Sequence, residues 1–143
     1  MTLQLSDFEY RLLLDLVYTG NWVMNSMRED DRIKEYDHLQ EKIFSACAGT
    51  KLSPVVQMAD GRAFPSSDYI GGGIHEVIAD YEDVAFFDIL AEELSLRDMR
   101  LEDQEVNVVN VDEEALEERM DDYAREFKEN GIERLMIVEE EVS

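Results

Sequence analysis

Apolar side chains recur at intervals of three and four in the first 27 residues, the spacing that places them along one side of an α-helix. These positions are Phe8, Leu12, Leu13, Leu16, Val17, Val23 and Met27. Ser6 and Glu9 have the spacing of a capping box, so we expect the helix to begin after Ser6. Tyr10, Leu14 and Tyr18 extend the apolar surface around the helix, which predicts that it is enclosed on most sides.

A second helix is predicted between the polar turn at 28–31 and Ala48-Gly49, where the glycine ends it. Its apolar positions are Ile33, Tyr36, Leu39, Ile43, Phe44 and Cys47. Because the link between the two helices is short, we expect them to form an antiparallel αα-hairpin. Gly20 costs the first helix about 1 kcal/mol relative to alanine, which predicts a kink or a close helix contact there.

The segment 50–73 interrupts the helical pattern, since it holds both prolines and four of the seven glycines. Asp60 and Gly61 suit a turn with positive φ, which predicts a short β-hairpin joining 55–58 to 62–64. The glycines at 71–73 precede a helix, whose free amides could hold phosphate. No Gly-Lys-Ser/Thr motif and no nearby cation accompany them, so a flexible connection is the preferred interpretation.

Helical spacing returns over 74–99 and predicts two helices or one bent helix. The valine-rich stretch 106–111 favours an extended segment, because β-branched side chains suit strands. Asp112 is placed to cap a final helix that Gly131 ends, and 132–138 is predicted to form a strand before the acidic tail.

Together these elements predict a mainly α fold of about five helices, with the αα-hairpin at the N-terminus. Residues 1–143 are expected to form a single acidic helical domain, in which 50–73 is an irregular connection. A minor peripheral β element is expected from parts of 55–64, 106–111 and 132–138.

The chain carries 35 acidic and 13 basic side chains, a formal charge of −22. A surface this negative repels phosphate backbones and anionic lipid and attracts basic proteins, so we expect neither direct nucleic-acid binding nor membrane association. Hydrophobic residues make up 45% of the chain, which places the acids on the surface of a folded core. Only four of the cations are lysines, so adaptation to a saline cytoplasm is an alternative explanation of the acidity.

Cys47 is the only cysteine, which excludes an internal disulfide and favours a reducing, cytoplasmic location. The N-terminus has no basic region before its apolar residues, and no apolar run approaches the length of a bilayer span. We therefore expect neither a signal peptide nor a transmembrane helix.

Glu35 and His38 form a Glu-x-x-His pair, which helical bundles use to hold iron or manganese. The only other histidine, His75, lacks a glutamate three residues before it. A mononuclear metal site built from Glu35, His38 and His75 would therefore require two helices to converge. The alternative is that these side chains lie on solvated helix faces.

Glu76, Asp80 and Asp83 are a second candidate set, because their spacing places them on one helix face. Clustered carboxylates suit Mg²⁺ when a nucleotide supplies further ligands. A run of charged residues is more commonly a solvated face, and no EF-hand loop is present. A divalent metal is the only cofactor that the sequence suggests.

No nucleophile elbow, nucleotide-binding loop or other catalytic motif is present, which favours a protein that is not an enzyme. Our leading hypothesis is an acidic interaction protein that binds a basic protein partner and could occlude that partner's nucleic-acid-binding surface. One alternative is a divalent-metal-dependent enzyme that uses either of the two clusters. The other is a homo-oligomeric scaffold, a dimer in which a helix face such as Phe86 with Ile89 pairs with its copy, or a salt-adapted protein.

Overall fold

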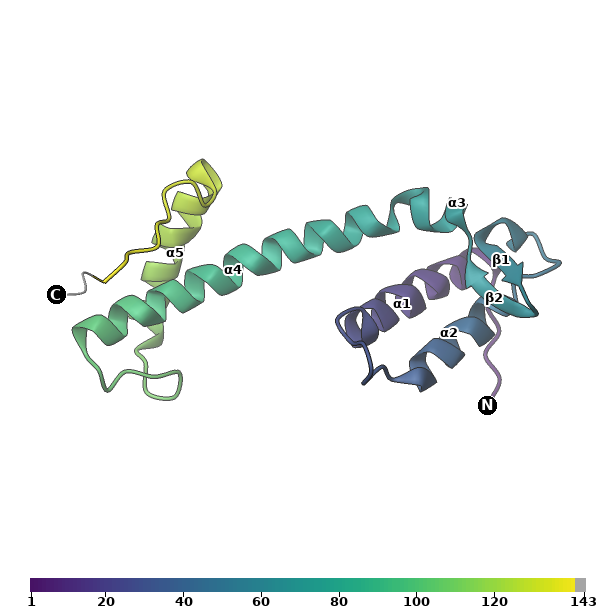
Figure 1. Ribbon diagram of the computed structural model, residues 1–143, viewed down its shortest axis with the longest axis horizontal. Helices are drawn as coiled ribbons and strands as arrows, with labels where there is room; N and C mark the ends of the chain where they lie inside the picture. Colours follow the sequence, from purple (N-terminus) through teal and green to yellow (C-terminus); the bar gives the residue numbers. More distant parts are fainter. Residues whose placement is uncertain (141–143) are drawn as a thin grey trace. The chain divides into compact units, whose positions relative to one another are not determined.

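The computed structural model describes residues 1–140 and is built mainly from helices (Figure 1). Five are α-helices: α1 (Asp7–Asn25), α2 (Lys34–Ser45), α3 (Ser67–Tyr69), α4 (His75–Glu102) and α5 (Glu113–Asn130). Between α2 and α4 lie the 3-10 helix η1 (Ser53–Val55), the strands β1 (Val56–Ala59) and β2 (Arg62–Pro65), and the π-helical turn η2 (Ile70–Ile74). The predicted mainly α fold with a minor β element is confirmed.

The chain divides into two compact units, which we call the N-terminal unit (Met1–Ala79) and the C-terminal unit (Asp80–Ser143). Each has its own buried residues, described in turn below. The expectation that 1–143 form a single domain stays a prediction. None of the helices within 1–140 is long and apolar enough to cross a membrane.

Helix α1 begins as its sequence predicts, because Ser6 and Glu9 form the capping box. The Ser6 amide donates to Glu9 Oε2 (2.8 Å), and the Glu9 amide donates to Ser6 Oγ (3.2 Å). The helix runs continuously through Gly20, and no atom lies within 4 Å of the position that a Cβ would take at this glycine. No close helix contact within the described chain therefore explains Gly20.

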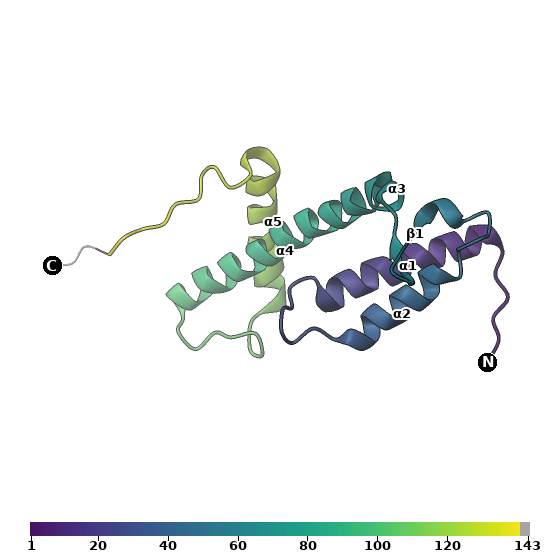
Figure 2. The same ribbon diagram turned by 45° about the vertical axis from the view of Figure 1, so that its right-hand side comes forward.

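Helices α1 and α2 lie side by side as the predicted αα-hairpin, with the β-hairpin packed against α2 (Figures 1 and 2). The core of this unit consists of Leu14, Tyr18, Phe44, Cys47, Tyr69, Ile74 and Ile78. The prediction that α1 is enclosed on most sides is wrong, since Phe8, Leu16 and Val23 are exposed. The small unit contacts α1 on the side that carries Leu14 and Tyr18 and leaves its apolar opposite side uncovered.

The predicted β-hairpin is confirmed, with Val56 opposite Pro65 and Ala59 opposite Arg62. Its two-residue turn has positive φ at both Asp60 (52°) and Gly61 (74°), the conformation for which Asp-Gly is favoured. The rest of 50–73 contains the short helices η1 and α3, and the chain kinks at the glycines of η2 before α4 begins. Gly73 has φ 107°, a value that L side chains rarely adopt.

In the C-terminal unit, α4 continues as one helix to Glu102 and packs against α5. The ring centroids of Phe87 and Phe127 lie 5.4 Å apart, and the Tyr123 hydroxyl donates to the Asp98 carboxylate. Both predicted ends of α5 are confirmed. Asp112 Oδ1 accepts from the Ala115 amide (3.2 Å), and Gly131 ends the helix with φ 57°.

The strands predicted at 106–111 and 132–138 are absent, and β1 with β2 is the only strand pair among the described residues. Hydrogen bonds of asparagine side chains hold 106–111 in a turn instead. The Asn107 amide donates to Asn110 Oδ1 (2.7 Å), and Asn110 Nδ2 donates to the Glu105 carbonyl (2.8 Å). Valine-rich sequence forms a strand only when another strand pairs with it, and the described part of the C-terminal unit contains no strand that could do so.

Candidate functional site

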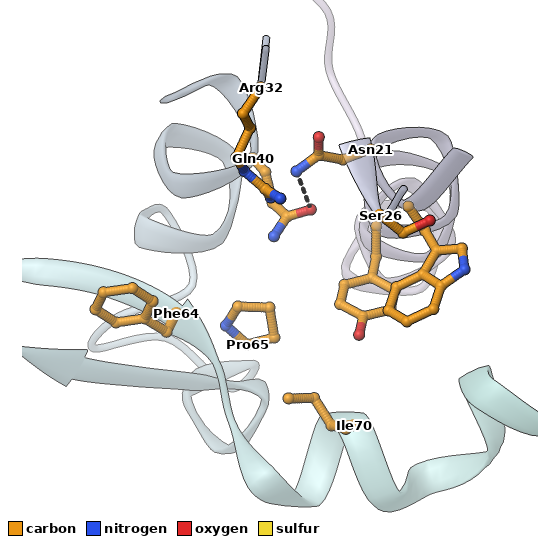
Figure 3. Close-up of a pocket in the computed structure, with 9 residues that line it drawn as sticks. Asn21, Ser26, Arg32, Gln40, Phe64, Pro65 and Ile70 are labelled. Atoms are coloured by element: carbon orange, nitrogen blue, oxygen red, sulfur yellow. Dashed lines mark hydrogen bonds between the residues drawn. The ribbon is translucent and has the colours of Figure 1, made fainter. Parts of the chain in front are cut away.

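The N-terminal unit contains an open cleft of about 420 Å³ between α1, α2, the β-hairpin and η2. Figure 3 shows Phe64, Pro65 and Ile70 on one side of this cleft and residues of α1 and α2 on the other. The complete lining is Tyr18, Asn21, Trp22, Ser26, Arg32, Gln40, Phe64, Pro65 and Ile70. The cleft thus combines aromatic and aliphatic walls with a few polar groups, a composition common to ligand sites.

The aromatic wall is held by contacts between α1 and the start of α4. Tyr18 Oη lies 2.6 Å from His75 Nε2, and the rings of Trp22 and His75 pack edge to face with centroids 4.8 Å apart. Burial raises the pKa of Tyr18 above its ordinary value of 10, and the hydroxyl, protonated at neutral pH, donates to His75 where Nε2 carries no hydrogen. The contact fixes Trp22 and Tyr18 in place and occupies Nε2 of His75.

The polar wall is a network that begins at two buried asparagines of α1, Asn21 and Asn25. Asn25 is 1% exposed, and its side chain bonds the amide (2.8 Å) and carbonyl (2.9 Å) of Ile33 and the Oδ1 of Asn21 (2.8 Å). Asn21 Nδ2 in turn donates to Asp37 Oδ1 (3.0 Å) and Gln40 Oε1 (3.1 Å). The network thereby joins α1, the turn before α2, and α2 itself.

Arg32 is neutralised by Asp37 beside the cleft. Its Nε and Nη2 donate to the two carboxylate oxygens at 2.6 and 2.7 Å. This pairing lowers the pKa of Asp37 to about 2, so the ion pair persists through the neutral range. The polar wall therefore has little net charge. On the same wall, the side-chain amide nitrogen of Gln40 points across the cleft toward Pro65 (Figure 3). Such a wall suits an uncharged ligand that has a hydrogen-bond acceptor.

The structure does not gather the first set of predicted metal ligands. Glu35 and His38 are exposed on α2, whereas His75 is partly buried at the start of α4 and bonded to Tyr18. Among residues 1–140, no group of three or more His, Cys, Asp or Glu side chains lies close enough to hold a metal ion. Metal binding by these residues stays a prediction that the observed arrangement does not favour.

The second predicted set, Glu76, Asp80 and Asp83, lies on α4 as the spacing predicted, and all three side chains are exposed. Because the three belong to one exposed helix, they form a solvated carboxylate row without a further ligand from another element. Cys47, by contrast, is 1% exposed in the core. Burial raises the pKa of its thiol, which Arg11 lowers only in part, so Cys47 is a packed thiol at neutral pH.

The negative charge is divided very unequally between the two units. The C-terminal unit has 23 acidic and 6 basic residues, a formal charge of −17, whereas the N-terminal unit has 12 and 7, a charge of −5. Within the described part of the C-terminal unit, every acidic side chain except Glu92, Asp98 and Glu126 is exposed. Most of the molecule's negative potential therefore comes from residues 80–143.

Helix α5 carries the densest part of this charge. Leu116, Met120, Tyr123 and Phe127 are buried or half-buried at helical spacing and face α4. On the opposite side lie six exposed carboxylates, which we call the acidic face of α5: Glu114, Glu117, Glu118, Asp121, Asp122 and Glu129. The buried stripe holds the helix in place, so these carboxylates are presented as an ordered row.

Sequence reasoning missed the two groups that shape the cleft, the Asn21–Asn25 network and the rings around Trp22. The available signal was the spacing of Asn21 and Asn25 by four residues on an otherwise apolar helix, a pattern that predicts a shared buried face. The acidity itself was evident, but the boundary after Ala79 that divides it between two units was not. In comparisons with protein-family models, curated proteins and solved structures, this chain has no match.

Proposed function

We propose that this protein is an acidic, non-enzymatic interaction protein whose C-terminal unit binds a basic protein partner in the cytoplasm. The observation that carries the proposal is the division of charge, −17 in the C-terminal unit against −5 in the N-terminal unit. Opposite potentials on two surfaces steer association and select partners. A partner that binds nucleic acid through the same basic surface would have that surface occluded.

Two cations, Arg125 and Lys128, lie beside the six carboxylates of the acidic face of α5, which therefore keeps a net negative charge. Arg97 pairs with Asp98 (2.8 Å) and Arg119 with Glu102 (2.6 Å), and neither carboxylate belongs to that face. Of the face itself, Asp122 is the member that forms an ion pair, with Arg125. The other carboxylates of the face remain available to cations of a partner, where desolvation makes each pair stronger than on an open surface.

The test compares two variants of equal charge. One removes four carboxylates from the acidic face of α5: Glu117→Gln, Glu118→Gln, Asp121→Asn and Glu129→Gln. The matched control removes four exposed carboxylates from the N-terminal unit: Glu29→Gln, Asp30→Asn, Asp60→Asn and Asp68→Asn. Titration calorimetry with an oligolysine peptide should show about tenfold weaker binding for the α5 variant and less than about twofold for the control. Equal losses would show that only total charge matters and would overturn the proposal.

A second candidate function is supported by the cleft of the N-terminal unit, which offers Trp22 and Phe64 as apolar walls and the Gln40 amide as a donor. These groups suit an uncharged ring that carries a carbonyl oxygen. Because Trp22 is the only tryptophan of the chain, its fluorescence reports directly on this cleft.

Benzamide is a suitable probe for the cleft, since it joins an apolar ring to a carbonyl acceptor. Saturable quenching of Trp22 emission by benzamide is expected, and Gln40→Leu should weaken it by about fivefold through loss of the hydrogen bond. The control is Leu39→Gln, a change on the same helix at a residue that does not line the cleft. Quenching that stays linear, or that is equal in both variants, contradicts this second candidate.

A further inference from the structure

Helix α1 presents an uncovered apolar side, which we call the outer face of α1. It consists of Phe8 (71% exposed), Leu12 (47%), Leu16 (70%), Val23 (74%) and, just past the end of the helix, Met27 (91%). Together these side chains expose on the order of 500 Å² of apolar surface, near the upper end of what single patches on monomeric proteins show. An exposed apolar patch of this size is often a site of interaction with another molecule.

The outer face has almost no charge, although the chain as a whole has −22. The charged side chains of α1 are Asp7, Glu9, Arg11 and Asp15. Glu9 is engaged in the capping box, and Arg11 pairs with Asp15 (2.5 Å) beside Tyr69, whose hydroxyl also donates to Asp15 (2.7 Å). From Leu16 onward, the outer face offers no carboxylate to a basic partner and no cation to an anionic one.

Gly20 lies among the residues of the outer face, and no atom lies within 4 Å of the position that a Cβ would take there. A glycine inside a helix is unfavourable by about 1 kcal/mol relative to alanine, and nothing in the described chain packs against it. A second helix that crosses α1 there could approach closely, because no side chain keeps it away.

We propose that the outer face of α1 binds the outer face of a second copy of this chain, with the two helices antiparallel about a two-fold axis. In this register, Phe8 of one copy lies opposite Met27 of the other, and Leu12 lies opposite Val23. Leu16 then lies opposite Thr19 and next to Gly20, so its bulky side chain faces the open position that the glycine leaves. A two-fold interface requires such self-complementarity, and the spacing of these residues provides it.

The chemistry of the face selects this occupant over others. A basic partner would find no unengaged carboxylate from Leu16 onward, and the cations beside the face, Arg11 and Arg28, are already paired with Asp15 and Asp31 rather than free for an anionic membrane surface. The formal charge of the N-terminal unit is only −5, and the carboxylates nearest the contact are engaged within each copy, Glu9 in its capping box and Asp15 with Arg11. The apolar area is below the roughly 800 Å² per partner of stable complexes, so we expect a dimer that dissociates in the micromolar range.

Sedimentation equilibrium of the full chain from micromolar to millimolar concentration tests the proposal. Leu16→Glu places a charge in the contact and should weaken dimerisation by at least about tenfold. The matched control is Leu39→Glu, which changes a 51% exposed leucine of α2 and should alter the dimerisation constant by less than about twofold. Both positions are solvent-exposed, so both variants should fold, and circular dichroism verifies this.

The antiparallel register is tested by a paired change. Leu12→Glu alone should weaken the dimer, whereas Leu12→Glu combined with Val23→Arg should restore it, because the new glutamate of each copy then faces the new arginine of the other and two ion pairs form across the contact. Restoration supports the antiparallel arrangement. A double variant as weak as Leu12→Glu contradicts the register, and a parent chain that stays monomeric at millimolar concentration overturns the proposal.

The dependence of affinity on salt distinguishes this dimer contact from the binding of a basic partner. Two copies of charge −22 repel one another, so salt that screens this repulsion should strengthen the dimer. The binding of a basic protein to the C-terminal unit should instead weaken as salt is added. A dimer that salt dissociates would be held by charge rather than by the apolar outer face, and it would contradict the inference.

Discussion

Asn25 is the residue on which the junction between α1 and α2 depends most. Its side chain satisfies both backbone polar groups of Ile33 and bonds Asn21, with 1% of its surface exposed. Asn25→Ala should lower the free energy of unfolding by about 2–3 kcal/mol, because it leaves buried polar groups without partners. Ser26→Ala, at the exposed next position, should be nearly neutral. Urea denaturation of both variants measures the difference, and equal stabilities would contradict the role of the network.

Asp37 gives the N-terminal unit a specific dependence on acid. Its hydrogen bonds with Arg32 lower its pKa from the ordinary 3.8 to about 2 in the folded chain. The stabilisation is therefore complete above about pH 4 and is lost as the pH falls through about 2. With the side chain 27% exposed, we expect Asp37→Asn to cost at most about 2 kcal/mol at pH 7. Urea unfolding of both chains should show this difference shrinking from pH 5 to pH 2, and a constant difference would contradict it.

Helix α5 packs against α4 through a buried ring, Phe127. Phe127 is 6% exposed and packs against Phe87 and Tyr123 at centroid distances of 5.4 and 5.9 Å. Phe127→Ala should cost about 3–5 kcal/mol. Hydrogen exchange should then accelerate along α5 while α1, in the other unit, keeps its protection. The control Lys128→Ala changes an exposed neighbour, and loss of protection in α1 as well would show that the units are not separate.

Elements with local signals could be predicted from the sequence. The capping box at Ser6, the Asp60-Gly61 turn and the Asp112 cap act through neighbouring residues, and each forms as expected. The strands at 106–111 and 132–138 could not be judged locally, because strand formation depends on a partner edge elsewhere in the chain. The uncovered side of α1 was missed for a related reason, since burial depends on how many other elements surround an apolar helix.

At the scale of the whole molecule, composition showed the negative charge but not its division. The boundary after Ala79 falls within α4, where no change in sequence pattern marks it. Likewise, the cleft could not be predicted, because Trp22, Gln40 and Phe64 come from three elements whose packing the sequence pattern does not specify. The structure therefore shows where the acidic residues are concentrated, in the C-terminal unit, and which surface displays them, the acidic face of α5.

The measurement that tests the central claim most directly is capture of basic proteins from a cell lysate by the immobilised full chain, repeated as salt rises from about 0.1 M to about 0.5 M. The parent chain and the N-terminal control variant should retain the same basic protein at low salt and release it at high salt, and the α5 variant should fail to retain it. If no basic protein is captured, or if the α5 variant captures it as well as the parent chain, the negative potential of the C-terminal unit is not what binds partners.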